Sequence, residues 1–222
     1  MKKLIAALAA ATALPLIAQA QQASPVAQDP HKQIERYREL LADGNPAELL
    51  EMRGEYLWKQ KRGPKNASMQ ACDLGLGAGK VEGVNAVLPR YFADVDRVMD
   101  LESRIVHCVV TLQGLTMAEV TKRPHSLNPS ERQTDHEALT AYVVGLSRGA
   151  KVNLPQSHPK ERESFLRGEK MFFFKGGPYD FACATCHSVD GQRIRLQDLP
   201  NFQKADNAQR AFTTWQIGRA HV

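Results

Sequence analysis

The residues best suited to chemistry are Cys183 and Cys186, which are separated by two residues and followed at once by His187. In such a run the two thiols can add to the vinyl groups of haem, and the adjacent imidazole can reach the iron. The spacing therefore predicts one covalently bound haem c, with Cys183 and Cys186 as thioether anchors and His187 as an axial ligand.

Three other kinds of site use closely spaced cysteines, and each fits this sequence less well. A thioredoxin-like motif needs a strand–helix–strand context, but the chain shows no sustained alternation of apolar and polar residues. A zinc site needs a further ligand in register, and none is evident. A structural disulfide explains neither His187 nor an export signal. A thiol-redox protein without haem remains the alternative outside the cytochromes.

The second axial position is open. No methionine follows Met171, and no histidine lies between His187 and His221. Methionine and histidine are the usual second ligands in c-type cytochromes. The iron is therefore expected to be five-coordinate or to take a ligand from outside this sequence.

The N-terminus has the pattern of a secretory signal peptide. Lys2 and Lys3 precede an apolar run over residues 4–18, and Ala18-Gln19-Ala20 matches a small-x-small cleavage site. We expect cleavage near Ala20, a periplasmic protein, and no membrane span in the mature chain. Removing residues 1–20 lowers the net charge from +5 to +3, which does not favour nucleic-acid binding.

An internal repeat appears when the chain is shifted by 114 residues. Residues 54–77 and 168–191 then share seven identities in 24 ungapped positions, including Cys72 with Cys186. The repeat and the dominant helical periodicity predict a mostly α protein with two cytochrome c-like domains, over residues 21–150 and 151–216.

Helix signals mark several segments. Asn45-Pro46 is typical of a helix start, and apolar residues from Leu101 to Leu112 fall on one helical face. Asp135 is a candidate cap for a helix through Leu146, and residues 160–174 form another candidate helix. Residues 121–133 are expected to be a loop, and residues 153–159 a linker.

The first copy of the repeat has lost the haem motif. Met69 stands in the place of the first cysteine, and Asp73 in the place of the histidine. This domain is therefore expected to be without haem. Cys72 is left with Cys108 as its only unassigned partner, and two leftover cysteines in an oxidising compartment usually form a disulfide. Two buried free thiols are the alternative.

The last six residues, 217–222, match the read-through of a common sequencing-library adapter. We therefore expect these residues to be an artefact and the second domain to be incomplete, so that His221 is no candidate ligand.

Three segments carry a resemblance to the SoxA family: residues 72–77, residues 88–94 with 99–104, and residues 181–187. The chain resembles the single-haem kind, whose first domain holds a disulfide. The resemblance implies the haem subunit of an L-cysteine S-thiosulfotransferase, which pairs with a SoxX cytochrome and couples thiosulfate to a cysteine of the carrier SoxYZ. It also implies a catalytic persulfide cysteine, which is expected to lie beyond residue 222.

Other residues carry weaker signals. Arg193 and Arg195 follow the motif and are candidates to attract thiosulfate, or else to pair with haem propionates or lie in solvent. The remaining histidines are expected to be structural or exposed rather than ligands: His31, His107, His125, His136 and His158. The alternative function is a periplasmic electron carrier without sulfur-transfer chemistry.

Overall fold

The computed structural model describes residues 47–122, 134–194 and 197–209, together with residues 32, 36, 37, 39 and 40. The chain divides into two compact units, Met1–Arg38 and Glu39–Val222. All the elements discussed below belong to the second unit. The predicted signal peptide, Arg195 and residues 217–222 lie outside the described residues.

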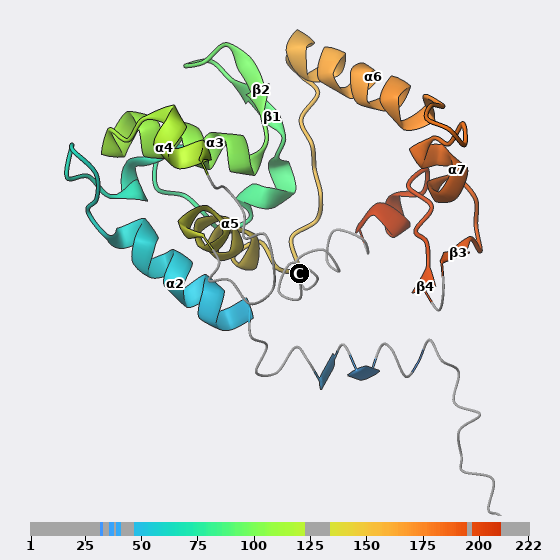
Figure 1. Cartoon of the computed structure of the whole chain (residues 1–222), viewed down its shortest axis with the longest axis horizontal. Helices are drawn as coiled ribbons and strands as arrows, with labels where there is room; N and C mark the ends of the chain where they lie inside the picture. The colour runs from blue at the N-terminus through green and yellow to red at the C-terminus, as the bar shows by residue number, and fades with distance from the viewer. Residues whose placement is uncertain are drawn as a thin grey trace, which may run out of the picture. The chain divides into compact units, whose positions relative to one another are not determined.

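Helices dominate the described part of the chain, as predicted (Figure 1). The long helices are α2 (Ala47–Lys59), α3 (Leu101–Cys108), α5 (Asp135–Gly145) and α6 (Pro159–Phe173). The short helical elements are η1 (Met69–Ala71), η2 (Val84–Val87), the π-helical η3 (Val109–Gln113), α4 (Met117–Thr121) and α7 (Cys183–His187).

Two small antiparallel hairpins complete the described elements. Strand β1 (Arg90–Phe92) pairs with β2 (Arg97–Met99), so that Tyr91 lies opposite Val98. Strand β3 (Arg193–Ile194) pairs with β4 (Gln197–Asp198). Strands of two or three residues are too short to produce a periodic pattern, which is why the sequence did not indicate them.

The hydrophobic core lies in the N-terminal part, which we define as residues 47–150. Its centre is the contact between α2 and α5. The two helices approach so closely at Gly54 that an added Cβ would lie 2.0 Å from the carbonyl oxygen of Ala138. Trp58 packs beside Tyr142, with ring centroids 6.1 Å apart. Glycine at position 54 therefore permits the closest helix packing in this core.

The start of α5 corrects the prediction that Asp135 caps the helix. Thr134 is the cap: its hydroxyl accepts a hydrogen bond from Glu137 N at 3.2 Å, and Thr134 N donates to Glu137 Oε2 at 2.6 Å. This reciprocal pair satisfies two backbone donors at the helix start. Asp135 is the first helical residue, and its carboxylate pairs with Arg53 and Arg62.

The structure reproduces the internal repeat in its backbone. Arg62 bridges Ala67, and the equivalent Gly176 bridges Phe181. Each bridge closes a turn that contains a residue with positive φ, 44° at Asn66 and 52° at the equivalent Asp180. Helices α2 and α6 end at equivalent residues, and η1 and α7 begin at equivalent residues. The two copies therefore share one local fold.

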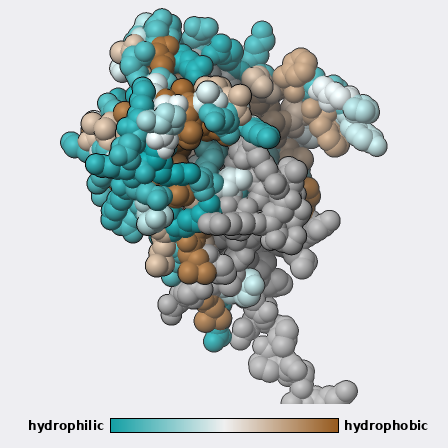
Figure 2. Space-filling view, turned by 60° about the vertical axis from the view of Figure 1, so that its left-hand side comes forward, coloured by the Kyte–Doolittle hydropathy of each residue, from teal (hydrophilic) through white to brown (hydrophobic). Residues whose placement is uncertain are grey.

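The C-terminal part, residues 151–209, differs from the first copy in having almost no core. Its buried residues among those described are Glu161, Ala184 and Asn201. Its large apolar side chains are exposed instead. On the face of the molecule drawn in Figure 2, apolar residues also reach the surface among hydrophilic ones. Within the described residues, no helix has the length and apolar character needed to cross a membrane.

Candidate functional site

Helix α7 presents the cysteine pair. It begins after Ala182, whose backbone N–H donates to Thr185 Oγ1 at 3.0 Å, and Ala184 is the residue that turns inward. Cys183 is consequently exposed and Cys186 half-buried, and both are free thiols. One helical turn thus places two thiols within reach of a single group at the surface.

His187 is held in one ring orientation. Its Nδ1 lies 3.0 Å from the carbonyl oxygen of Pro200, and its ring stacks on Phe202 with centroids 4.8 Å apart. A carbonyl oxygen only accepts hydrogen bonds, so Nδ1 carries the proton in this contact. The lone pair of the neutral imidazole is then on Nε2, the nitrogen that remains for a metal ion.

The residues around α7 fit haem c. A pair of thiols and one imidazole with a fixed tautomer is the donor set that this group requires. The C-terminal part also exposes a set of large apolar side chains: Phe165, Leu166, Met171, Phe173, Phe174, Tyr179, Phe181, Val189, Ile194 and Phe202. A large flat porphyrin is an apolar surface against which such side chains can pack.

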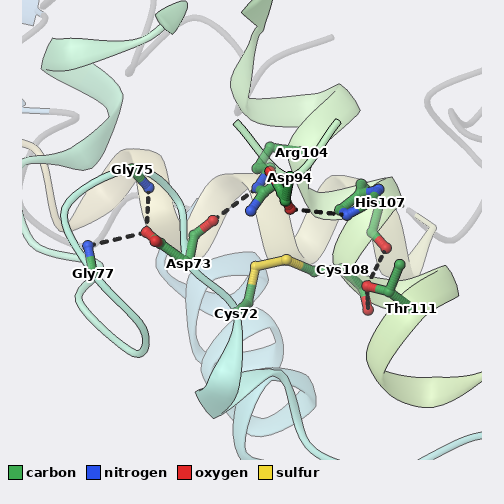
Figure 3. The surroundings of a disulfide bond; sticks show 9 residues. All are labelled: Cys72, Asp73, Gly75, Gly77, Asp94, Arg104, His107, Cys108 and Thr111. Carbon is green, nitrogen blue, oxygen red and sulfur yellow. Dashed lines mark hydrogen bonds and ion pairs between the residues drawn. A yellow bond between two sulfur atoms is a disulfide. The ribbon is translucent and has the colours of Figure 1, made fainter. Parts of the chain in front are cut away.

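In the first copy the residues equivalent to the two cysteines, Met69 and Cys72, are buried. Met69 is fully buried at 0% exposure, and Cys72 and Cys108 form a disulfide with a Cα–Cα distance of 5.6 Å. Figure 3 shows the disulfide joining the loop after η1 to the end of α3. The pairing is the one expected from the sequence. The described residues of this copy contain no cluster of three or more metal-ligating side chains.

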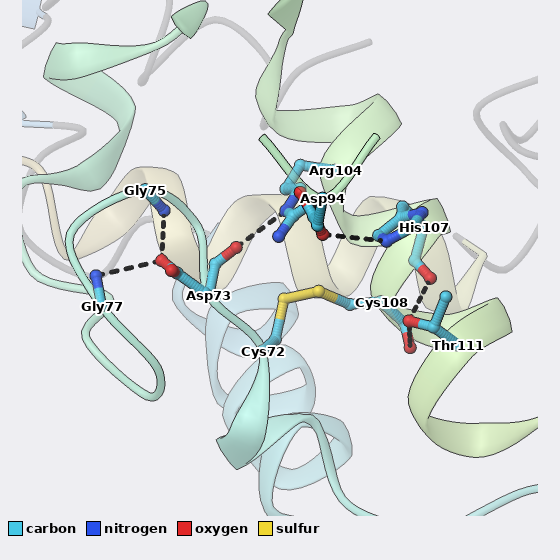
Figure 4. Close-up of polar contacts among 9 residues, drawn as sticks. All are labelled: Cys72, Asp73, Gly75, Gly77, Asp94, Arg104, His107, Cys108 and Thr111. Atoms are coloured by element: carbon cyan, nitrogen blue, oxygen red, sulfur yellow. Dashed lines mark hydrogen bonds and ion pairs between the residues drawn. A yellow bond between two sulfur atoms is a disulfide. The ribbon is translucent and has the colours of Figure 1, made fainter. Parts of the chain in front are cut away.

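Asp73, which replaces the histidine, has a structural role instead. Its Oδ1 accepts hydrogen bonds from Gly75 N at 2.7 Å and Gly77 N at 3.0 Å. Its carbonyl oxygen accepts a hydrogen bond from Arg104 Nε at 2.8 Å (Figure 4). The carboxylate therefore fixes the loop that follows Cys72.

Arg104 is the cation at the centre of this loop network. Its side chain is 6% exposed, and its Nη1 donates to both carboxylate oxygens of Asp94, at 2.9 and 2.7 Å. Its guanidinium also lies 4.0 Å from the ring centroid of Phe92. A buried guanidinium needs such partners to offset its lost hydration. Arg104 lies in one of the segments that carry the resemblance to the SoxA family, but the sequence gave no sign of this role.

Arg193, one of the two candidates to attract thiosulfate, forms an ion pair with Asp198. Arg193 Nε lies 2.9 Å from Asp198 Oδ1, across the β3–β4 hairpin. Arg193 remains half-exposed, so its proposed contact with an anion stays a prediction. Of the other histidines that the structure describes, His107 pairs with Asp94 at 3.3 Å, His158 caps α6, and His136 is buried in α5. His31 and His125 lie outside the described residues.

Comparison with protein families gives a match to the SoxA/TsdA cytochrome c domain over residues 53–152. This range contains the disulfide and the Arg104 network, and it ends before Cys183. The N-terminal part therefore carries the sequence features of a cytochrome c domain although it lacks the haem motif.

Curated relatives extend the similarity over most of the chain. The chain is 48% identical over 188 residues to the L-cysteine S-thiosulfotransferase subunit SoxA of Hydrogenophilus thermoluteolus, covering 85% of this chain and 68% of that protein. It is 32% identical to a protein of the same name from Hydrogenobacter thermophilus, covering 80% of this chain and 65% of that one. The chain thus spans about two thirds of these relatives.

A solved structure has a related fold. The crystal structure of SoxXA from P. pantotrophus contains a chain that matches with a TM-score of 0.59 and 20% sequence identity, covering 84% of this chain and 76% of that chain. At this identity the match concerns the fold alone.

Proposed function

The chain belongs to the SoxA family, and we propose that the protein is the haem subunit of an L-cysteine S-thiosulfotransferase that couples thiosulfate to a cysteine of a SoxYZ-type carrier. The observation that carries the proposal is the free thiol pair on α7 beside a histidine with a fixed tautomer. The identity to named SoxA subunits supplies the reaction.

Each residue of the C-terminal site has a defined task in this proposal. Cys183 and Cys186 would form the two thioether bonds, and His187 would bind the iron through Nε2, since its Nδ1 donates to the carbonyl oxygen of Pro200. Haem c, when bound, supplies a redox centre that accepts electrons from the sulfur substrates. The exposed aromatic side chains of this part would supply apolar surface for the porphyrin.

None of the four cysteines in this sequence is assigned the sulfur-transfer step. Cys72 and Cys108 are joined to each other, and in this proposal Cys183 and Cys186 would hold the haem. A persulfide formed on any of them would require breaking the disulfide or giving up a thioether. We therefore place the transfer cysteine in a part of the protein outside these 222 residues.

The proposed protein is periplasmic, carries one haem and works with a SoxX-type cytochrome. The signal-peptide pattern at residues 1–20 supports export. The buried disulfide supports an oxidising compartment, because such bonds rarely persist in the cytosol. The fold shared with a chain of a SoxXA structure supports the partner.

Haem attachment is tested by expression in the periplasm with a c-type maturation system. We expect a pyridine haemochrome of the c type, a mass increase of one haem, and no free thiols after alkylation. The Cys183→Ser/Cys186→Ser variant should lose the haem, whereas the matched Cys72→Ser/Cys108→Ser variant should keep it. An unmodified mass for the wild type would exclude a cytochrome.

The reaction is tested with the complete gene product, its SoxX-type partner, the carrier and thiosulfate. We expect the mass of the carrier cysteine to increase by one thiosulfonate adduct, and haem reduction to accompany the step. A protein that is reduced and reoxidised normally but never modifies the carrier would be a plain electron carrier.

A further inference from the structure

One carboxylate at the start of α6 binds both parts of the chain. Glu161 Oε2 accepts a hydrogen bond from His158 N at 3.1 Å, which closes the capping box of α6. Glu161 Oε1 accepts a hydrogen bond from Tyr91 N, in strand β1, at 2.8 Å. The residue is only 7% exposed. A cap requires one of these oxygens, so the second oxygen is available to join α6 to the N-terminal part.

The side chains around Glu161 strengthen the same contact. The ring of His158 stacks on Tyr91, with centroids 3.6 Å apart and planes 8° from parallel. Lys160 Nζ donates to the carbonyl oxygen of Asp96 at 2.6 Å and lies 2.7 Å from Asp96 Oδ2. Tyr91 Oη donates to Asp96 Oδ1 at 2.7 Å. The residues at the start of α6 thus contact the β1–β2 hairpin at Tyr91 and at Asp96.

This contact is not a feature of the repeat. The residue of the first copy equivalent to Glu161 is Ala47, at the start of α2, which has no carboxylate to offer. The bridging carboxylate therefore belongs to the second copy, where α6 leads into the segment that carries α7.

We propose that Glu161 is a positioning residue, which fixes α6 and, through it, the Cys183–His187 segment against the β1–β2 hairpin. The C-terminal part buries almost nothing of its own, so few contacts are available to set its orientation. Besides this junction, Asn153 N donates to the carbonyl oxygen of Ala86 at 2.8 Å, and Gln209 Nε2 donates to the carbonyl oxygen of Ala150 at 3.1 Å. The inference rests on the proposed function only in that the haem serves as a probe of the orientation.

The Glu161→Gln variant tests this role in the haem-loaded protein. Glutamine has one acceptor oxygen and an NH2 donor, so it cannot accept both backbone N–H groups. We expect hydrogen exchange at the Tyr91 amide to become about tenfold faster or more, which corresponds to losing one charge-assisted hydrogen bond. Pseudocontact shifts from the oxidised haem iron should decrease at amides of the N-terminal part, because the orientation is averaged.

Two further variants define the result. Glu163→Gln is the matched control, since Glu163 is exposed on the same helix and its ion-pair partner among the described residues is Arg167, at 3.8 Å; it should behave as the wild type. Glu161→Asp keeps the charge at the helix start but is one methylene too short to reach both amides. It should reproduce the loss of pseudocontact shifts even where Glu161→Gln fails to fold.

Two outcomes would overturn the inference. Unchanged Tyr91 protection in the Glu161 variants would show that the bridge contributes nothing. Faster exchange with unchanged pseudocontact shifts would show that Glu161 acts locally and does not set the orientation. A wild type without haem would give no such shifts, which refutes the proposed function, while hydrogen exchange would still test the bridge.

Discussion

At the scale of single residues, the Asp94 carboxylate pairs with Arg104 and His107 beside the disulfide. Partial burial raises the pKa of this carboxyl, but the hydrogen bond and charge of Arg104, with a smaller effect of His107, more than offset this and leave the pKa below its ordinary value of 3.8. A depressed pKa stabilises the folded state above the pKa of the unfolded chain, and that stability is lost as the pH falls through the folded-state pKa.

We therefore predict that the contribution of Asp94 to stability begins to fall near pH 4 and is lost as the pH drops further, through the folded-state pKa. Urea unfolding followed by circular dichroism between pH 7 and pH 3 measures it. The Asp94→Asn variant should be less stable than the wild type at pH 7, and the two should converge in acid. Comparing the two proteins cancels the effects of the other carboxyls. A stability difference that stays constant down to pH 3 would contradict the role of Asp94.

Residues differ in how far the sequence reveals them. The spacing of Cys183, Cys186 and His187 within five consecutive residues predicts a haem site, because haem attachment requires it, and that site stays a prediction. The roles of Arg104 and Glu161 could not be predicted, because their partners come from distant segments, Asp73 and Asp94 for one and Tyr91 for the other. A capping signal was present at His158-Pro159 with Glu161, but it indicates a helix start and not a second contact.

At the scale of elements, the α2–α5 contact gives a matched pair of glycine substitutions. In Gly54→Ala the new Cβ would lie 2.0 Å from the Ala138 carbonyl oxygen and 2.6 Å from Tyr142 Cβ. Alanine favours a helix by about 1 kcal/mol over glycine, but this overpacking should lower the free energy of unfolding by about 2 kcal/mol.

The control for Gly54→Ala is the equivalent position of the second copy. Among the described residues, nothing lies within 4 Å of a Cβ added at Gly168. Gly168→Ala should therefore be neutral or stabilise this chain by up to about 1 kcal/mol. Thermal unfolding of the two variants compares them directly, and equal destabilisation of both would refute the packing argument.

The disulfide fastens one element to another. Cys72 and Cys108 are separated by 36 residues in sequence and exposed by only 1% and 3%. Closing a loop of this size lowers the entropy of the unfolded chain, which stabilises the folded state by about 3–4 kcal/mol at room temperature. The Cys72→Ala/Cys108→Ala variant should lose stability by this amount while keeping its haem. Unfolding in urea measures the loss, and a change below about 1 kcal/mol would contradict the loop-closure account.

Elements with a strong local signal were predicted better than the others. The helix of residues 160–174 corresponds to α6, and the helical face from Leu101 continues from α3 into η3. Helix α4 was missed, because five residues are too few for a periodic pattern and Thr116 resembles an ordinary loop residue. The predicted loop at residues 121–133 lies mainly outside the described residues.

At the scale of the whole molecule, the two copies of one local fold differ in what covers them. The first copy packs α2 against α5 around its disulfide, and a cluster of its apolar residues is buried there. In the second copy, Met171 is 72% exposed although its equivalent, Leu57, is 6% exposed. A unit of this size without buried apolar surface cannot offset the entropy of ordering its chain.

Haem attachment should therefore stabilise the C-terminal part much more than the N-terminal part. Expression in the cytoplasm without a maturation system provides the haem-free protein, and periplasmic expression provides the loaded one. Hydrogen exchange in α6 and α7 should slow by at least about tenfold on loading, since burying even one large aromatic side chain contributes about 2 kcal/mol. Exchange in α3 and α5 should change little, because their core contains no part of the haem site.

The Cys183→Ser/Cys186→Ser variant, exported in the same way, separates the effect of haem from that of the compartment. Equal protection of α6 in the loaded and haem-free proteins would mean that some other contact orders this part of the chain.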